Sequence, residues 1–253
     1  MSIKYVGEIF KTNNYGNLIV TSYTNTRNVN VKFIHTGYET VAMMKDIRKG
    51  CVKDKLHPSV YGVGVIGDEI VNIKSVAPKE YKLWTKVLER CYDIKYHNRY
   101  PTYKDCEMSN EFKYFPYFMK WCNKQIGFDS KDDKGKPFAL DKDLLVKGNK
   151  IYSEDTCVFL PRELNNLLTK NNSSRGEYPI GVSYDKNMGK ITACLRKDNK
   201  SVGLGIFKTE IEAFNAYKEA KEDYIKEVAN KWKDQIEPRA YEALINYQVE
   251  ITD

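Results

Sequence analysis

Hydrophobic and polar residues alternate through the first part of the chain, which is the pattern of β-strands that bury one face. The alternation is clearest over residues 17–20 and 28–33. Turn signals separate these stretches at Asn13-Asn14, Tyr15-Gly16 and Thr36-Gly37. The pattern predicts an N-terminal β-rich module over residues 1–75.

The hydrophobic period changes after residue 78, where apolar residues recur at helical spacing and predict a helix over 79–93. A second apolar helix is expected after Ser109, a good N-cap residue, with Pro116 breaking or kinking it. Its aromatic stripe is interpreted as core. Residues 137–170 then predict a strand, a turn at 147–149, a second strand and a short helix that begins near Pro161. Residues 76–172 form the second predicted module.

The last part of the chain has a β-β-β-α rhythm that follows a linker at 171–176. Strands are expected at 179–184, 190–197 and 201–207, with turns at 186–189 and 198–199. Thr209 and Glu212 have the spacing of a capping box at the start of a long helix. Small and aromatic residues mark the buried face of that helix: Ala213, Ala216, Tyr217, Ala220, Tyr224 and Val228. Residues 173–253 are the third predicted module, and the fold class is α+β.

Charge is unevenly distributed along the chain, whose formal net charge is +7. Residues 173–208 carry 7 basic and 3 acidic residues, whereas residues 209–253 carry 6 basic and 11 acidic ones. This balance suits a polyanionic partner and also suits a merely solvated surface. No apolar run approaches the ~18 residues of a membrane span, and no apolar signal core opens the chain. A cytoplasmic protein with no membrane partner is therefore expected.

The six cysteines stand singly, without a CxxC pair, and the three histidines form no cluster beside them. A structural zinc site needs clustered Cys or His at short spacing, so buried free thiols are expected instead.

The third module resembles the AP2 family of DNA-binding domains along its whole length. The matching residues are Gly181-Val182, Tyr184, Gly189-Lys190, Ala193, Gly205, Phe207, the capping box, and Glu212-Ala213 through Ala216-Tyr217. In that family the sheet enters the major groove of DNA and the helix packs behind it. The resemblance implies that one sheet face presents five cations to duplex DNA: Lys186, Lys190, Arg196, Lys197 and Lys200. The arginine- and tryptophan-rich strands of the plant members are absent, so their base preference cannot be carried over.

The second module resembles the HNH nuclease motif of phage homing endonucleases. The stretches are Leu140-Asp141-Lys142-Asp143 and the segment from Asp155 to Asn165. The resemblance places Asp141 at the metal-binding Asp, Asn165 at the helical Asn and Lys142 at the general-base His. It implies one divalent ion, Mg²⁺ or Mn²⁺, held on the scissile phosphate.

The residue at the base position departs from the family, because a protonated lysine has no lone pair to accept a proton. Acidic neighbours at positions 141 and 143 favour the protonated form. His97 or a water molecule could supply the base instead, although nothing in the sequence places His97 nearby. An active nuclease and an inactive scaffold that kept the fold both remain open.

Nearly the whole chain resembles proteins of phages and prophages that look like free-standing homing endonucleases. The shared stretches include residues 57–67, 83–106, 140–157 and 240–253, in this order. The resemblance implies sequence-directed binding of double-stranded DNA and metal-dependent hydrolysis, as a nick or a cut, in the cytoplasm of a bacterial host. The alternative is a catalytically inactive DNA-binding protein that acts as a regulator or targets a host protein.

Overall fold

The computed structural model describes residues 5–69, 75, 77–169, 176–198 and 200–252. The chain divides into two compact units, residues 1–122 and 123–253. Both contain helices and antiparallel sheets, which confirms the α+β class. Among the described residues, no helix combines the length and the apolar character needed to cross a membrane.

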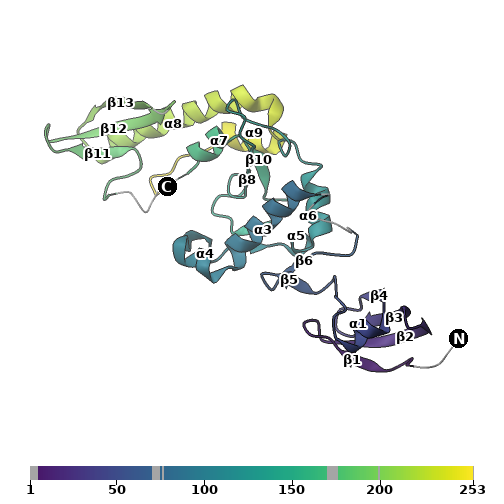
Figure 1. The fold of residues 1–253 in the computed structure, drawn as a ribbon. Coiled ribbons are helices and arrows are strands. Elements are labelled where there is room, and N and C mark those ends of the chain that lie inside the picture. The colour runs from purple at the N-terminus through teal and green to yellow at the C-terminus, as the bar shows by residue number, and fades with distance from the viewer. Residues whose placement is uncertain (1–4, 70–74, 76, 170–175, 199, 253) are drawn as a thin grey trace. The chain divides into compact units, whose positions relative to one another are not determined.

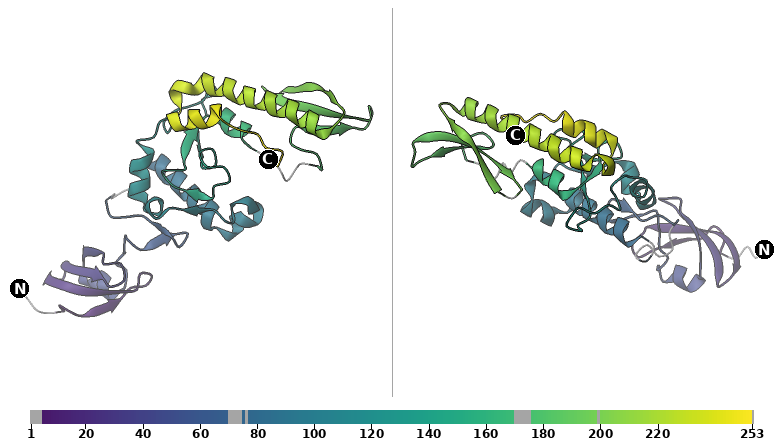
Figure 2. Two further views of the ribbon diagram at one scale, coloured as in Figure 1. Left: turned by 180° about the vertical axis from the view of Figure 1, so that it is seen from behind. Right: turned by 90° about the horizontal axis from the view of Figure 1, so that it is seen from above.

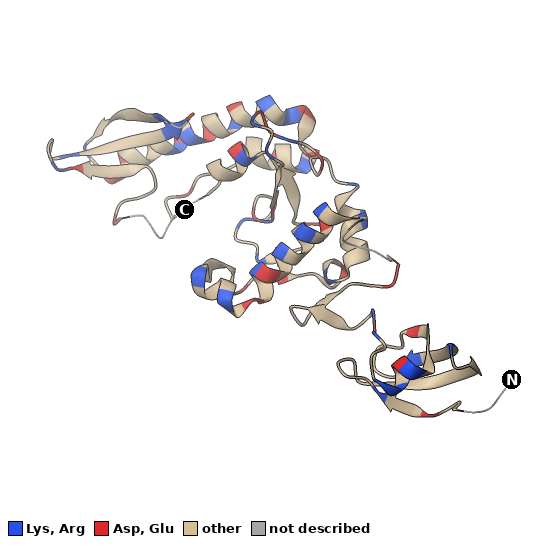
Figure 3. Ribbon diagram, in the orientation of Figure 1, with Lys and Arg blue, Asp and Glu red and all other residues tan. Residues whose placement is uncertain are grey.

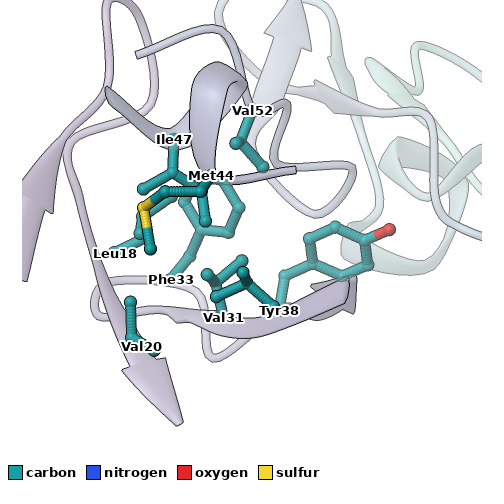
Figure 4. Close-up of a cluster of buried hydrophobic side chains, with 9 residues drawn as sticks. Leu18, Val20, Val31, Phe33, Tyr38, Met44, Ile47 and Val52 are labelled. Carbon is teal, nitrogen blue, oxygen red and sulfur yellow. The ribbon is translucent and has the colours of Figure 1, made fainter. Parts of the chain in front are cut away.

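The first unit opens with a four-stranded antiparallel meander. Its strands are β1 (Ile9–Lys11), β2 (Asn17–Asn25), β3 (Asn28–Phe33) and β4 (Glu39–Ala42), paired in that order. Every second residue of β3 is buried, as the alternating sequence predicts. These side chains pack under helix α1 (Met44–Arg48), and Figure 4 shows Phe33, Met44 and Ile47 together in this core. The hairpin of β5 (Pro58–Val60) and β6 (Gly64–Val65) follows.

The rest of the first unit is helical. It contains α3 (Pro78–Tyr92), α4 (Ile94–Arg99), the 3-10 turn η1 (Pro101–Tyr103), the short strand β7 (Glu107–Met108), α5 (Asn110–Lys113) and α6 (Phe115–Cys122). Ser109 caps α5 by accepting the N–H of Phe112 at 3.2 Å. The predicted second helix is divided into α5 and α6 just before Pro116, because proline is tolerated in a first helical turn but not in an interior. Trp84 lies in the aromatic core and donates its Nε1–H to the Phe112 carbonyl at 2.8 Å.

The second unit begins with a ββα arrangement and ends with a sheet backed by a helix. Strand β8 (Ala139–Asp141) pairs antiparallel with β10 (Val158–Leu160), with β9 (Ile151–Tyr152) between them in the chain. Helix α7 (Arg162–Leu167) follows and packs against β8. The predicted first strand, turn and helix are confirmed, but two strands, β9 and β10, lie where one was expected. Pro161 is the N-cap residue and lies just outside the helix.

A three-stranded antiparallel sheet follows, made of β11 (Val182–Asp185), β12 (Lys190–Lys197) and β13 (Lys200–Phe207) in that order. Helix α8 (Glu210–Trp232) packs against one face of this sheet, continues beyond it and contacts α7 (Figures 1 and 2). The chain then turns through η3 (Lys233–Gln235) into α9 (Pro238–Ile245), which packs against α8. The β-β-β-α prediction is confirmed.

Two local features hold α8 in place behind the sheet. The capping box is present, because Thr209 accepts the Glu212 N–H at 3.2 Å and Glu212 accepts the Thr209 N–H at 3.2 Å. Gly181 has φ +76°, and a Cβ added there would lie 2.0 Å from the ring of Tyr217 on α8. Only glycine permits this approach of backbone to ring.

The boundary between the two units falls between residues 122 and 123. The finer division into three modules at 1–75, 76–172 and 173–253 stays a prediction. Most of the predicted linker at 171–176 lies outside the described residues. All six cysteines are reduced thiols, but the expectation of burial is wrong for Cys51 and Cys194, which are exposed.

Candidate nucleic-acid interface and candidate nuclease hairpin

The register of the three-stranded sheet assigns its side chains to two faces. Residues directly opposite on neighbouring strands share a face, and successive residues along a strand alternate. Val182, Ala193 and Leu195 are buried on the face that α8 covers. The other face, which we call the open face, carries the alternate set: Ser183, Asp185, Lys190, Thr192, Cys194, Arg196, Ser201, Gly203 and Ile206.

The cations of the open face lie at its two ends. Lys190 begins β12 beside the turn that contains Lys186, whereas Arg196 lies near the β12–β13 hairpin. The residues between them on this face of β12 are Thr192 and Cys194, which are short and uncharged. Figure 3, which colours both faces of the sheet alike, shows blue toward the ends of its strands and tan between. In the described part of the chain, Lys186, Lys190 and Arg196 form no ion pair, and their side chains form no hydrogen bond.

Lys197 and Lys200 do not belong to the open face, so the prediction that five cations share one face is wrong for these two. Lys197 follows Leu195 on the covered face, and Lys200 lies opposite Lys197 in the register. The Nζ of Lys197 lies 2.5 Å from Oε2 of Glu227 on α8 and 4.9 Å from the centre of the Tyr224 ring. The hydrogen bond to Glu227 raises the pKa of Lys197. Successive side chains of a strand point to opposite faces of the sheet, so cations that are adjacent in sequence do not share a face.

Asp141 ends β8, as the HNH resemblance requires, and lies opposite Val158 of β10. Its Oδ1 accepts the backbone N–H of Asp143 at 2.9 Å and that of Leu144 at 2.8 Å. Burial raises the pKa of this carboxyl above its ordinary value, and the charge of Asp143 acts in the same direction. Burial likewise raises the pKa of the nearby Cys157 thiol to about 12.

Lys142 is buried and lies at the start of the loop that follows β8. We call this loop, residues 142–150, the hairpin loop, and Lys142 makes its hydrogen bonds within it. Its Nζ donates to Oδ1 of Asp143 at 2.6 Å and to the carbonyl of Asn149 at 2.6 Å. Asn149 returns two bonds from its amide, to the carbonyls of Lys142 at 2.8 Å and Ile151 at 2.7 Å. The ammonium is a donor in each contact, so the geometry supports a structural role for Lys142 rather than the predicted role as base.

The remaining predicted catalytic and metal residues are placed on different elements. Asn165 is half-buried on α7, the helix that packs against β8, and its side chain has no hydrogen bond within the described residues. His97 belongs to the first unit, whereas Asp141 belongs to the second. The Nε2 of His97 lies 2.8 Å from the carbonyl oxygen of Arg90, which ties α4 to α3. A carbonyl only accepts, so Nε2 must carry the proton.

The residues of the hairpin do not make up a complete metal site. Asp141 has one carboxylate oxygen, Oδ2, that takes part in no described hydrogen bond, and Asn165 could add an amide oxygen. No group of three or more His, Cys, Asp or Glu suited to a metal ion occurs among the residues that the structure describes. The position that would hold the imidazole of an HNH centre is a lysine that is already hydrogen-bonded.

Two residues that the sequence-based prediction did not include stand out in the second unit. Cys194 is an exposed thiol in the middle of the open face. Lys221 is a half-buried cation on α8, and it has no ion pair or side-chain hydrogen bond among the described residues. Alternation along β12 could have identified Cys194. No local signal distinguishes Lys221 from the other lysines of α8, because its environment comes from segments distant in sequence.

No protein-family model matches the chain, and no curated protein or solved structure is significantly similar to it. The AP2 and HNH resemblances therefore rest on the motifs and on the arrangement of strands and helices.

Proposed function

We propose that the protein binds double-stranded DNA through the open face of the three-stranded sheet. The observation that carries this proposal is the arrangement of that face. Lys190 and Arg196 lie at its ends without described partners, and short side chains lie between them. A surface of this kind leaves its cations available to phosphates and its centre accessible to base edges.

The dimensions of the face agree with a DNA groove. Lys190 and Arg196 are six residues apart on one strand, which corresponds to ~20 Å at the rise of a β-strand. The major groove of B-DNA is ~12 Å wide and admits a β-ribbon. The two cations can therefore reach the phosphates on either side of the groove while Thr192 and Cys194 face its floor.

A double substitution at the two ends of the face tests the proposal. The full chain carrying Lys190→Ala and Arg196→Ala should bind a mixed-sequence duplex more weakly, with a smaller dependence on salt. Each lost phosphate contact reduces the slope of log K against log salt by ~0.9, so two contacts correspond to roughly a 60-fold loss at ~0.1 M salt.

The matched control is Lys226→Ala, which removes an exposed cation of α8 that pairs with Asp223 at 3.5 Å. We expect this variant to bind with nearly wild-type affinity. Unchanged affinity and slope in the double variant would remove the open face from consideration.

A metal-dependent DNA endonuclease is the second candidate, with one hydrolytic site at the ββα hairpin. The observation that favours it is the position of Asp141, which ends β8 with its Oδ2 outside the described hydrogen bonds. Because the donor set is incomplete, this candidate ranks below DNA binding. A hairpin that kept its fold without cleavage agrees equally with the structural role of Lys142.

Incubation of the wild type with duplex DNA and Mg²⁺ or Mn²⁺, with and without a chelator, separates these alternatives. If the hairpin cleaves, Asp141→Ala and Asn165→Ala should abolish cleavage and leave DNA binding nearly unchanged. If the wild type does not cleave DNA because it lacks a general base, Lys142→His should supply that base and increase cleavage by on the order of 10²–10⁴-fold. If the wild type and Lys142→His both fold and bind DNA but neither cleaves it, the result would support a DNA-binding protein without nuclease activity.

The cytoplasm of a bacterial host is the compartment in which we propose that this binding occurs. A non-cleaving protein would act there as a regulator or through a host protein. The duplex-binding experiment tests both the cleaving and the non-cleaving protein, because each is proposed to bind DNA through the open face.

A further inference from the structure

The second unit contains a cleft of about 1120 Å³ that begins at one end of the open face. Cys194, Arg196 and Ser201 belong to both surfaces. In the described part of the chain, β12 has no strand partner beyond Ala193 on its β11 side, and the cleft lies beside this free edge. Helix α8 and helix α7 supply other parts of the lining. We call it the α7–α8 cleft.

The acidic side chains of the cleft are already engaged. Asp133 and Glu163 both bind Lys231, at 2.6 and 3.0 Å, and the hydrogen bond to Asp133 is the main cause of a raised pKa at Lys231. Asp198 accepts the hydroxyl of Tyr224 at 3.1 Å. The fourth, Asp132, accepts two backbone N–H groups of the loop that follows it.

Lys231 is paired with these acids and Arg162 donates to the carbonyl of Pro137, but the other four basic side chains of the cleft are not paired within the described residues. Lys134, Lys136, Arg196 and Lys221 line it, and their side chains form no ion pair or hydrogen bond among the described residues. Burial lowers the pKa of Lys221, which is the expected behaviour of an ammonium that has lost water and gained no anion. The cleft therefore combines engaged acids with unpaired cations, and a bound anion would complete it.

We infer that the α7–α8 cleft binds phosphate groups of the duplex that lies on the open face. This inference rests on the proposed function. Arg196 belongs to both the open face and the cleft. A DNA backbone that passes the Arg196 end of the sheet therefore continues directly from the open face into the cleft. Lys221 then contacts the backbone from α8, on the opposite side of the sheet edge from Lys190.

Substitution of Lys221 tests the cleft separately from the open face, to which Lys221 does not belong. Lys221→Met keeps most of the apolar stem and removes the charge, so the fold should be retained. We expect weaker binding of a mixed-sequence duplex and a salt slope smaller by ~0.9, the value for one phosphate contact. Lys221→Arg should restore both quantities, and Lys226→Met should leave them unchanged. Thermal unfolding of each variant checks its fold.

A second measurement distinguishes polynucleotide phosphate from free phosphate. The ¹⁵N signal of the Lys221 ammonium should shift and its pKa should rise when the duplex binds. If inorganic phosphate shifts this signal and the duplex does not, the assignment to DNA is overturned. If the wild type binds the duplex and Lys221→Met binds with equal affinity and slope, the cleft proposal fails and the open face stands. If the wild type binds no duplex, both proposals fail.

Discussion

The hairpin loop and the open face both carry charged side chains that the sequence marks as functional, and they use those side chains differently. In the hairpin loop, the side chains of Lys142 and Asn149 form hydrogen bonds with neighbouring groups of the hairpin. On the open face, Lys190 and Arg196 have no described partner. A motif residue is available to a ligand only when the fold leaves its polar atoms unsatisfied. By this criterion the sheet is the stronger candidate for function.

The largest expected effect compares Cys157, which directly precedes β10 of the ββα hairpin, with Cys194 of the open face. At pH 8, a pKa of about 12 leaves Cys157 with roughly one thiolate in 10⁴, and the side chain is also buried. Cys194 is exposed on the open face, so a maleimide should label it at least ~100-fold faster than Cys157. Mass spectrometry of the labelled peptides measures both rates.

The adduct on Cys194 should also block duplex binding, whereas labelling of Cys51 in a Cys194→Ser variant should not. Comparable rates for Cys157 and Cys194 would show that the hairpin is not closed as the structure describes. Full DNA binding by the Cys194 adduct would contradict the open face.

The next effect concerns the packing that supports the sheet. Gly181→Ala forces a Cβ into the Tyr217 ring at a positive φ, and we expect it to lower the free energy of unfolding by roughly 2–5 kcal/mol. Gly189→Ala is the matched control, since it also has a positive φ but meets only the Tyr184 hydroxyl, at 3.7 Å. Urea unfolding measures both variants. Equal losses at the two glycines would mean that the contact with Tyr217 is not required.

The next substitution is in the hairpin loop. Gly181→Ala disturbs packing, whereas Asn149→Ala removes hydrogen bonds. Asn149→Ala loses two amide donations and the acceptance of the Ile151 N–H at 3.1 Å. We expect a loss of about 2–3 kcal/mol in the free energy of unfolding, at ~1 kcal/mol for each bond.

Asn187→Ala in the β11–β12 turn is the control, because the side-chain amide of Asn187 makes no hydrogen bond in the described structure and its backbone N–H keeps the bond to Asp185. Its unfolding should change by less than ~0.5 kcal/mol. An Asn149→Ala variant as stable as Asn187→Ala would show that the loop does not depend on its polar network.

The smallest effect is the pH dependence contributed by Asp141. Because its folded-state pKa is raised, the folded protein binds this proton more tightly than the unfolded chain does. The free energy of unfolding therefore falls as pH rises from the unfolded pKa, ~3.9, through the raised folded value. Asp141→Asn keeps an oxygen that can accept the two backbone bonds and removes the charge. At neutral pH the variant should be more stable than the wild type, by on the order of 1 kcal/mol.

Denaturant unfolding at a series of pH values measures this difference, which should vanish below pH ~3 where both states are protonated. A variant that is less stable than the wild type at neutral pH would mean that the charged form of Asp141 is the one that the fold stabilises.

The sequence by itself determined the main elements of this protein and their order, although α1, α4 and α9 were not predicted. The strand period in residues 28–33, the N-cap at Ser109, the break at Pro116 and the capping box of Thr209 and Glu212 are all confirmed. Each is a local property, set by backbone dihedrals, side-chain period or hydrogen bonds within a few residues. The α+β class follows from the same local signals.

Only the tertiary structure decided which charged side chains are free. Lys197 and Arg196 are adjacent in sequence, yet Lys197 pairs with Glu227 on α8 and Arg196 lies on the open face. The HNH resemblance places Lys142 at the base position, but in the structure Lys142 donates to the carbonyl of Asn149, seven residues further along the chain. Lys221 borders a cleft that segments from residues 132 to 232 build together. The availability of a polar group depends on neighbours that folding brings from distant positions, and no local pattern records them.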